Sequence, residues 1–219
     1  MAEIGYFSVI RHEILEIIPP GDHRILDIGC GTGATLKQLK YCGKAMETCG
    51  IELNPDAAKI AAQNIDTILT GDAGVIEIPF KKNYFDYILF CDVLEHFFHP
   101  DQILGKYAPY LKNEGLIIVS IPNIKYYKIV LSLLFRDRFE YKDEGILDQS
   151  HIRFFTRHEI VNLFVHSDFE ILKILPKIGK KVLVKDTPLY SLLRNIPGSS
   201  FLTYQYCIIS RKKKDSMNS

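Results

Sequence analysis

The sequence predicts an α/β fold: a single doubly wound, mainly parallel sheet. Three observations predict it. An apolar strand at 24–28 runs directly into a glycine-rich turn and then into a helix, which is the first unit of such a sheet. Strand-like and helix-like segments then alternate as far as residue 122. The segment 116–120 is apolar almost throughout, as a central strand covered on both faces should be.

Local signals place the remaining elements. Proline at position 55 favours the first turn of a helix, and Thr156 with Glu159 forms a capping pattern. Helices are expected at 34–40, 55–62, 100–111 and 157–164, and at the N-terminus around Tyr6 and Arg11. Strands are expected at 24–28, 47–51, 67–70, 84–90, 116–120, 169–175 and 204–210, the last of them antiparallel.

The chain of 219 residues fits one domain, which we expect to occupy 1–210, with a basic and polar tail at 211–219. The segment 123–155 departs from the alternation. We expect this insertion after the fifth strand to form a lid on the substrate side and to determine specificity.

Composition excludes several classes of protein. The 27 basic and 26 acidic side chains nearly balance, so no nucleic-acid partner is expected. Five cysteines without a C-x-x-C pair are typical of reduced thiols in a cytoplasmic protein. The N-terminal region has no long apolar run, so neither a signal peptide nor a transmembrane segment is expected.

The glycine-rich turn, with Gly29, Gly31 and Gly33, predicts a ligand against the backbone. The spacing Gly29-x-Gly31-x-x-Ala34 also fits a dinucleotide, whose pyrophosphate would lie on this turn. Asp27 would oppose that pyrophosphate, whereas it favours the cationic S-adenosylmethionine. A nicotinamide cofactor is therefore the second interpretation.

An acid lies near the end of each of the first four strands: Asp27, Glu52, Asp72 and Asp92. Ligands of open α/β sheets bind at these carboxyl ends. Glu52 can accept two ribose hydroxyls, in either kind of cofactor, and Asp72 can accept the adenine amino group. A single acid of this kind could simply cap a helix, but four after a glycine-rich turn favour a binding site.

The run 25–33 resembles the first motif of the class I S-adenosylmethionine-dependent methyltransferases, and the resemblance covers about residues 1–175. Gly71-Asp72-Ala73 is similar to the family's adenine segment. Asp92 to His96, followed by Pro100, resembles the segment after strand four in small-molecule enzymes, including the ubiquinone-biosynthesis O-methyltransferases.

The resemblance implies S-adenosylmethionine as cofactor and S-adenosylhomocysteine as product. The segment 1–22 would cover the cofactor, and Arg11 would pair with its carboxylate. The implied cofactor-binding residues are Asp27, Gly29, Cys30, Gly31, Gly33, Glu52, Leu53, Asp72, Ala73, Cys91, Asp92, Tyr6 and Arg11.

Two histidines are candidate catalytic residues. His151 begins a segment, 151–156, that resembles methyltransferases of sugar and polysaccharide pathways, and His96 follows Glu95. A neutral imidazole near the methyl donor could take the proton of an attacking hydroxyl. The alternative is that each histidine only holds a loop in place.

No metal is expected. An alternative is that Asp92, Glu95, His96 and His151 hold a divalent cation, in a pattern similar to the Glu-x-x-Glu-His segment of the small-RNA 2′-O-methyltransferases. The first acid is an aspartate here, which departs from that pattern.

The insertion contains an apolar segment at 124–135 with basic residues on both sides. It is too short to span a bilayer, and we expect a lid or packing helix over the acceptor pocket. Lying in a membrane interface, as a peripheral contact, is the alternative. The aromatic residues Tyr126, Tyr127, Phe139 and Tyr141 could line that pocket or belong to the core.

These features together predict methyl transfer to a hydroxyl of a small molecule, such as a sugar, a phenol or a lipid-linked precursor, by a monomer or homodimer. The chain lacks the Asn/Asp-Pro-Pro-aromatic sequence with which enzymes that methylate nucleic-acid amines hold their target. Two alternatives remain: a non-catalytic S-adenosylmethionine-binding protein and a metal-dependent RNA 2′-O-methyltransferase.

Overall fold

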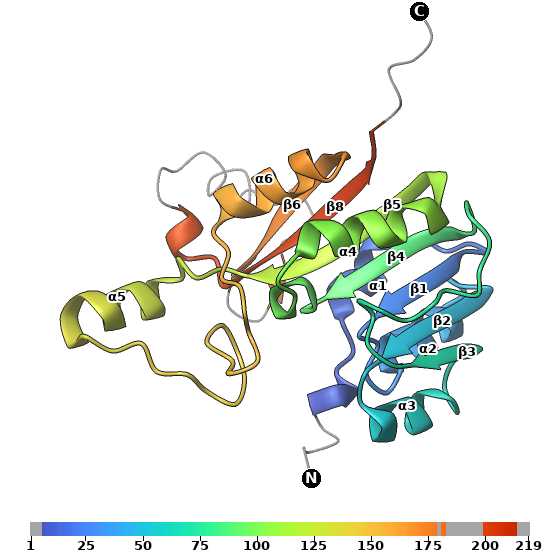
Figure 1. Cartoon of the computed structure of the whole chain (residues 1–219), viewed down its shortest axis with the longest axis horizontal. Coiled ribbons are helices and arrows are strands. Elements are labelled where there is room, and N and C mark those ends of the chain that lie inside the picture. The colour runs from blue at the N-terminus through green and yellow to red at the C-terminus, as the bar shows by residue number, and fades with distance from the viewer. Residues whose placement is uncertain (1–5, 179–180, 183–198, 214–219) are drawn as a thin grey trace, which may run out of the picture.

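The fold is one eight-stranded sheet in the computed structural model, which describes residues 6–178, 181–182 and 199–213 (Figure 1). The strand order is β3-β2-β1-β4-β5-β8-β6-β7. Strands β1 to β5 are parallel, and β8 is antiparallel to both β5 and β6, as predicted. The strands are β1 (Arg24–Ile28), β2 (Glu47–Glu52), β3 (Thr67–Thr70), β4 (Phe85–Cys91), β5 (Leu111–Pro122), β6 (Phe169–Ile178), β7 (Lys181–Val182) and β8 (Gln205–Lys212).

Two of the helices begin at residues whose side chains satisfy free N–H groups. The Asn54 side chain accepts hydrogen bonds from the second and third residues after it, and Thr156 and Glu159 form the predicted capping box. No helix of the described residues is both long and apolar enough to cross a membrane. The helices are α1 (His12–Ile17), α2 (Ala34–Tyr41), α3 (Pro55–Ala61), α4 (Pro100–Tyr107), α5 (Tyr127–Arg136) and α6 (Arg157–His166).

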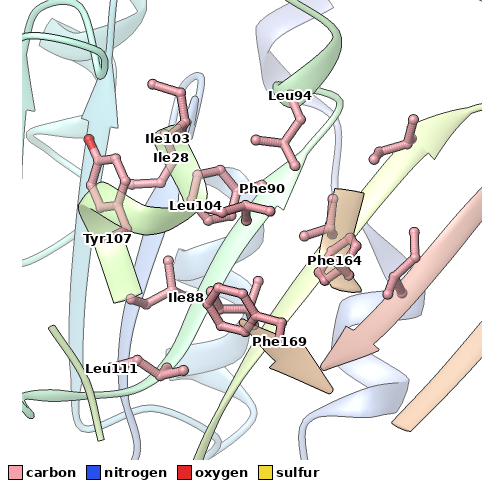
Figure 2. Close-up of a cluster of buried hydrophobic side chains, with 14 of the residues drawn as sticks. Ile28, Ile88, Phe90, Leu94, Ile103, Leu104, Tyr107, Leu111, Phe164 and Phe169 are labelled. Carbon is pink, nitrogen blue, oxygen red and sulfur yellow. The ribbon is translucent and has the colours of Figure 1, made fainter. Parts of the chain in front are cut away.

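Apolar side chains alternate between the two faces of the sheet. In β4, Ile88 and Phe90 belong to the core cluster that α4 and α6 cover, whereas Leu89 belongs to the cluster under α1 and α2. Figure 2 shows the first cluster, in which Phe164 of α6 lies among strand residues. Because both faces are buried, the segment 116–120 of β5 is apolar almost throughout, as the sequence indicated.

Two predicted boundaries were wrong. Helix α4 ends at Tyr107, and a short 3-10 turn that contains Pro109 leads directly into β5 at Leu111. Residues 113–115, which lie between the helix expected at 100–111 and the strand expected at 116–120, are therefore part of β5. This strand pairs with β4 through a register shift near Phe85. At the N-terminus, the 3-10 turn Tyr6–Ser8 and α1 are separate, and Arg11 precedes α1 instead of sharing a helix with Tyr6.

The sheet order reverses between β1 and β4, and ligands of open α/β sheets bind in the crevice at this point. The insertion leaves the sheet just after β5 and returns before α6, and a bridge between Asn123 and Phe155 joins its two ends. Helix α5 stands apart from the sheet and from the helices that cover it (Figure 1). Strand β8 ends at Lys212, two residues into the segment expected as a tail.

Candidate functional site

A cavity of about 1060 Å³ opens at the carboxyl ends of the parallel strands. It collects residues from β1, β2 and β4, from the N-terminal segment and from the insertion. The predicted site residues on its wall are Arg11, Asp27, Gly29, Cys30, Gly31, Glu52, Leu53, Asp72, Ala73, Cys91, Asp92, His96 and His151. The side chain of Tyr6 lies outside the described part of the chain.

The turn after β1 brings the backbone to the cavity. Gly29 and Gly31 have φ values of 72° and 56°, in the left-handed region that favours glycine. A Cβ atom on Gly31 would lie 2.4 Å from the carbonyl oxygen of Phe7, so the N-terminal segment packs directly on this turn. The Thr32 N–H also donates to the Phe7 oxygen at 2.9 Å. The turn therefore has no room for a side chain.

Gly33 was also expected to bind the cofactor, but it is not among the residues that line the cavity. It precedes α2 in a left-handed conformation, and a Cβ atom there would lie 2.8 Å from the Ile65 side chain. Gly33 thus serves the packing of the turn against the segment after α3.

Glu52 is buried at the end of β2 and organises the turn. One carboxylate oxygen accepts the Gly31 N–H at 2.7 Å, and the other accepts the Asn54 N–H at 2.8 Å. Each oxygen has a second lone pair, so both remain able to accept a ligand hydroxyl. This geometry suits the ribose role predicted for Glu52.

Asp27 is the most unusual acid of the site. It is buried, and its Oδ1 atom has no hydrogen-bond partner. Burial raises the pKa of Asp27 to about 7, the Arg11 guanidinium opposes this shift and Glu52 adds to it. A buried carboxylate without a partner is costly, and a cationic ligand group would offset that cost. Asp27 is therefore placed to accept from an ammonium group.

The raised pKa of Asp27 makes the ligand-free protein less stable as pH rises from about 4 to about 7, because only the unfolded chain releases this proton readily. We expect Asp27→Asn to stabilise the ligand-free protein at pH 8 by on the order of 2–4 kcal/mol and to weaken cofactor binding. Thermal unfolding at pH 5 and pH 8 checks this. A difference between variant and wild type that does not grow with pH would contradict the assignment.

The loop after β3 carries Asp72 and Ala73. The Asp72 Oδ1 atom accepts the Gly74 N–H at 2.7 Å. The Ala73 carbonyl accepts from Lys106 Nζ and from the Tyr107 hydroxyl, both at 2.9 Å. Helix α4 thus holds the loop against the cavity in the position predicted for adenine.

We expect Asp72→Ala to weaken S-adenosylmethionine binding about tenfold, the value of one hydrogen bond to a charged acceptor. Titration calorimetry measures it. Glu77→Ala is the matched control, because Glu77 is exposed in the same loop and does not line the cavity. Equal affinities for the two variants would remove Asp72 from the adenine site.

Arg11 is paired within the protein. Its guanidinium lies 2.7 Å from Asp92 Oδ2, while Asp92 Oδ1 accepts from Ser120 Oγ at 3.1 Å and from the Gln205 amide. The role predicted for Arg11, pairing with the cofactor carboxylate, would require the guanidinium to serve both groups. Nearby Cys91 has its pKa raised by burial, which keeps the thiol protonated.

Glu95, His96 and His151 meet at the end of the cavity formed by the insertion. The Glu95 carbonyl accepts the N–H groups of Ile152 and Arg153, which brings the end of the insertion beside the segment after β4. The two imidazole rings are 4.9 Å apart. The two predicted histidines are 55 positions apart in the sequence, but the structure brings their rings into contact.

Hydrogen bonds fix the ring orientation of both histidines. His151 Nδ1 lies 3.0 Å from the Ile146 carbonyl and His96 Nδ1 lies 3.1 Å from the Ser150 carbonyl. A carbonyl oxygen only accepts, so Nδ1 carries the proton and Nε2 keeps its lone pair when the ring is neutral. Burial lowers the pKa of His151, which keeps that ring neutral at pH 7.

The carboxylate of Glu95 faces this pair without a hydrogen-bond partner. Both of its oxygens are buried, and Oε1 lies 3.8 Å from His151 Nε2. Burial raises the pKa of Glu95 well above its ordinary value. One ligand atom from each of Glu95, His96 and His151 lies within 4.8 Å of the others, so these three could hold a cation. Asp92 does not belong to this group.

Several cavity residues were missed from the sequence. Lys177 and Gln205 line the cavity and are joined by a hydrogen bond of 3.1 Å. Gln205 is the first residue of an antiparallel strand, which places it at the same edge as the last residues of the parallel strands. The expected antiparallel strand at 204–210 could therefore have indicated Gln205 as a residue at this edge. Glu144 and Asp148 come from irregular parts of the insertion, where no pattern marks them.

The wall of the cavity is strongly acidic. Two basic residues, Arg11 and Lys177, face seven acids: Asp27, Glu52, Asp72, Asp92, Glu95, Glu144 and Asp148. Even where burial keeps Asp27 and Glu95 protonated, the other five acids outnumber the two basic residues, so the wall attracts cations and repels phosphates. The part of the insertion that reaches the cavity is 144–151, whereas no residue of α5 lines it. The predicted lid helix over the acceptor pocket was therefore misplaced.

The family model described as "Methyltransferase domain" matches residues 4–174. The chain is 30% identical over 145 residues to the "Putative 23S rRNA (guanine-N(1)-)-methyltransferase YxjB" of Bacillus subtilis, which covers 63% of this chain and 49% of that protein. It is 28% identical over 120 residues to a ubiquinone biosynthesis O-methyltransferase of Bradyrhizobium, and this alignment covers 51% of this chain and 44% of that protein. The chain thus spans about half the length of these relatives.

Among solved structures, the chain is similar to a SAM-dependent methyltransferase from Archaeoglobus fulgidus, with a TM-score of 0.65. The sequence identity is 18%, and the similarity covers 92% of this chain and 90% of that one. This likeness concerns the fold.

Proposed function

This chain belongs to the methyltransferase domain family and is a class I S-adenosylmethionine-dependent methyltransferase domain, and we propose that it methylates a hydroxyl group of a small-molecule acceptor. One observation carries the proposal. One cavity is lined both by the acids of the strand ends and by the paired histidines. It therefore offers room for a donor and an acceptor in the same cavity.

The donor would lie along the strand ends. The ribose hydroxyls would lie on Glu52, the adenine edge at Asp72 and Ala73, and the ammonium group at Asp27. The unpartnered Oδ1 of Asp27 supports this orientation, because it needs a cationic donor. The acidic wall would also favour the positive charge of the sulfonium.

The acceptor hydroxyl would attack the methyl carbon in line with the leaving sulfur. Holding the two partners in line and excluding water would supply roughly 7–11 kcal/mol of the barrier reduction. His151 would accept the hydroxyl proton at Nε2, since its Nδ1 already donates to the Ile146 carbonyl. His96 would position the acceptor beside that ring.

The charge of the cavity supports a small and uncharged or cationic acceptor. A nucleic acid would bring phosphates toward a wall with seven acids and two basic residues. The alignment with the relative named as an rRNA methyltransferase covers 63% of this chain and 49% of that protein. Sugar and phenol hydroxyls meet no such electrostatic barrier.

The test is transfer of a labelled methyl group. The protein is incubated with methyl-labelled S-adenosylmethionine and fractionated bacterial metabolites, and the labelled product is identified. We expect a small molecule with a new O-methyl group. Label in RNA would contradict the proposed acceptor class, and binding of donor without label in any fraction would favour a non-catalytic binding protein.

The cluster of Glu95, His96 and His151 favours a second candidate, metal-assisted transfer. The three residues fit a divalent cation, because Glu95 is buried without a hydrogen-bond partner and both imidazoles offer Nε2. A bound cation would lower the pKa of an acceptor hydroxyl. Treatment with EDTA separates the two candidates. Transfer without a metal predicts unchanged turnover, whereas a loss of turnover that Mn²⁺ restores would favour metal-assisted transfer.

A further inference from the structure

Residues 124–142 of the insertion form an exposed apolar arm around α5. The described residues contain sixteen exposed large apolar side chains, and six of them lie between 131 and 141. Leu134 and Phe135 are 69% and 75% exposed. Exposed apolar residues scattered over a surface are ordinary, but a group of this size marks an interaction site.

The sides of α5 differ in polarity. Lys128, Ser132 and Arg136 follow one another at intervals of four residues, so they share one face of the helix. Every other residue of α5 is apolar, and none of its side chains is buried. An amphipathic helix without a partner has its apolar face in water, which opposes stability unless another surface covers it.

Aromatic contacts hold the base of the arm and leave its tip free. Tyr126 contacts Tyr204 with ring centroids 5.4 Å apart, and Phe139 contacts Phe154 at 5.6 Å. Between these two anchors, α5 extends away from the sheet (Figure 1). The arm is therefore attached at a fixed place and presents α5 outward.

Charge identifies the kind of surface that fits. The arm carries five basic residues and two acids, whereas the whole chain has 27 and 26. Phosphates of a nucleic acid would satisfy the cations and leave Leu134 and Phe135 in water. A second copy of the arm would bring two positively charged surfaces together. Only an anionic lipid surface offers negative headgroups directly above an apolar layer.

We propose that the arm docks on an anionic lipid surface, with Lys128 and Arg136 at the headgroups. Leu131 and Leu134, which are three residues apart and lie away from the face with Lys128 and Arg136, would insert at the boundary of the acyl chains. The helix would lie along the interface. This interaction does not depend on the acceptor class proposed above, because no residue of α5 lines the cavity.

Vesicle flotation of the full chain tests the proposal. We expect binding to vesicles of phosphatidylcholine with phosphatidylglycerol and much weaker binding to phosphatidylcholine alone, with a decrease at high salt. Each basic residue near such a surface contributes about fivefold, so Lys128→Glu with Arg136→Glu should reduce binding at least ~30-fold. Leu131→Ser with Leu134→Ser should reduce it at least ~10-fold.

Matched controls lie on other parts of the surface. Tyr41→Ser removes a side chain that is 85% exposed at the end of α2, and Lys59→Glu with Lys82→Glu reverses two exposed charges. These variants should bind vesicles as the wild type does. All variants should keep wild-type affinity for S-adenosylmethionine, which shows that they are folded and separates this test from that of the proposed function.

Three results would overturn the proposal. They are equal binding to neutral and anionic vesicles, equal losses in the arm variants and the controls, and a dimer in solution that Leu134→Ser dissociates while vesicles are not bound. The last result would assign the arm to a second copy of the chain.

Discussion

Glu52→Ala is expected to weaken S-adenosylmethionine binding roughly 100-fold or more, the largest effect on cofactor affinity of any single carboxylate in the site. The substitution would remove the two charge-assisted hydrogen bonds proposed to the ribose, each worth about 1.5–3 kcal/mol. It also removes the acceptor of the Gly31 and Asn54 N–H groups, which shape the turn. Titration calorimetry with S-adenosylmethionine measures the loss.

Two further variants make this result specific. Glu52→Gln keeps the length of the side chain and one acceptor oxygen, so its affinity should lie between those of the wild type and Glu52→Ala. Asp56→Ala is the matched control, since Asp56 follows the same strand, is highly exposed and pairs with Lys59. Undiminished affinity in Glu52→Ala would exclude the ribose role.

His151→Ala is expected to lower turnover by about 10²- to 10⁴-fold with no more than a small change in cofactor affinity. The range is that of a lost general base. Turnover and cofactor affinity should respond differently because His151 belongs to the insertion and not to the glycine turn. The rate of labelled methyl transfer to the identified product and calorimetry on the same sample measure the two quantities.

Loss of a hydrogen bond to the insertion could imitate loss of a base, and His151→Asn separates the two effects. The asparagine amide can donate to the Ile146 carbonyl as Nδ1 does, but it has no basic nitrogen. Its turnover should be as low as that of the alanine variant. His158→Ala, an exposed histidine of α6, should have wild-type turnover. Full activity in both His151 variants would leave His151 with a structural role alone.

The strand ends could be predicted from the sequence because parallel strands finish at one edge. Asp27, Glu52 and Asp72 each lie at or near the end of a strand, and the alternation with helices implies the parallel arrangement that brings them together. The turn glycines were predicted by the same argument, since Gly29 and Gly31 have positive φ. These inferences needed only local pattern and sheet topology.

Other features depend on contacts that local pattern does not contain. Gly33 has the spacing of a ligand glycine, but its missing side chain makes room for Ile65. Arg11 appeared free to bind the cofactor, yet Asp92 lies 2.7 Å away. In the insertion, Glu144 and Asp148 line the cavity, while helix α5 points away from the sheet (Figure 1). The sequence pattern of the insertion does not show which of its parts lines the cavity.

A crystal structure with S-adenosylhomocysteine bound tests the central claim most directly, namely that the acids at the strand ends form the cofactor site. We predict the ribose hydroxyls on Glu52, the adenine amino group at Asp72 and the ammonium group within hydrogen-bond distance of Asp27. A nucleoside bound elsewhere, with the glycine turn empty or taken by NAD at equal concentration, would contradict the account.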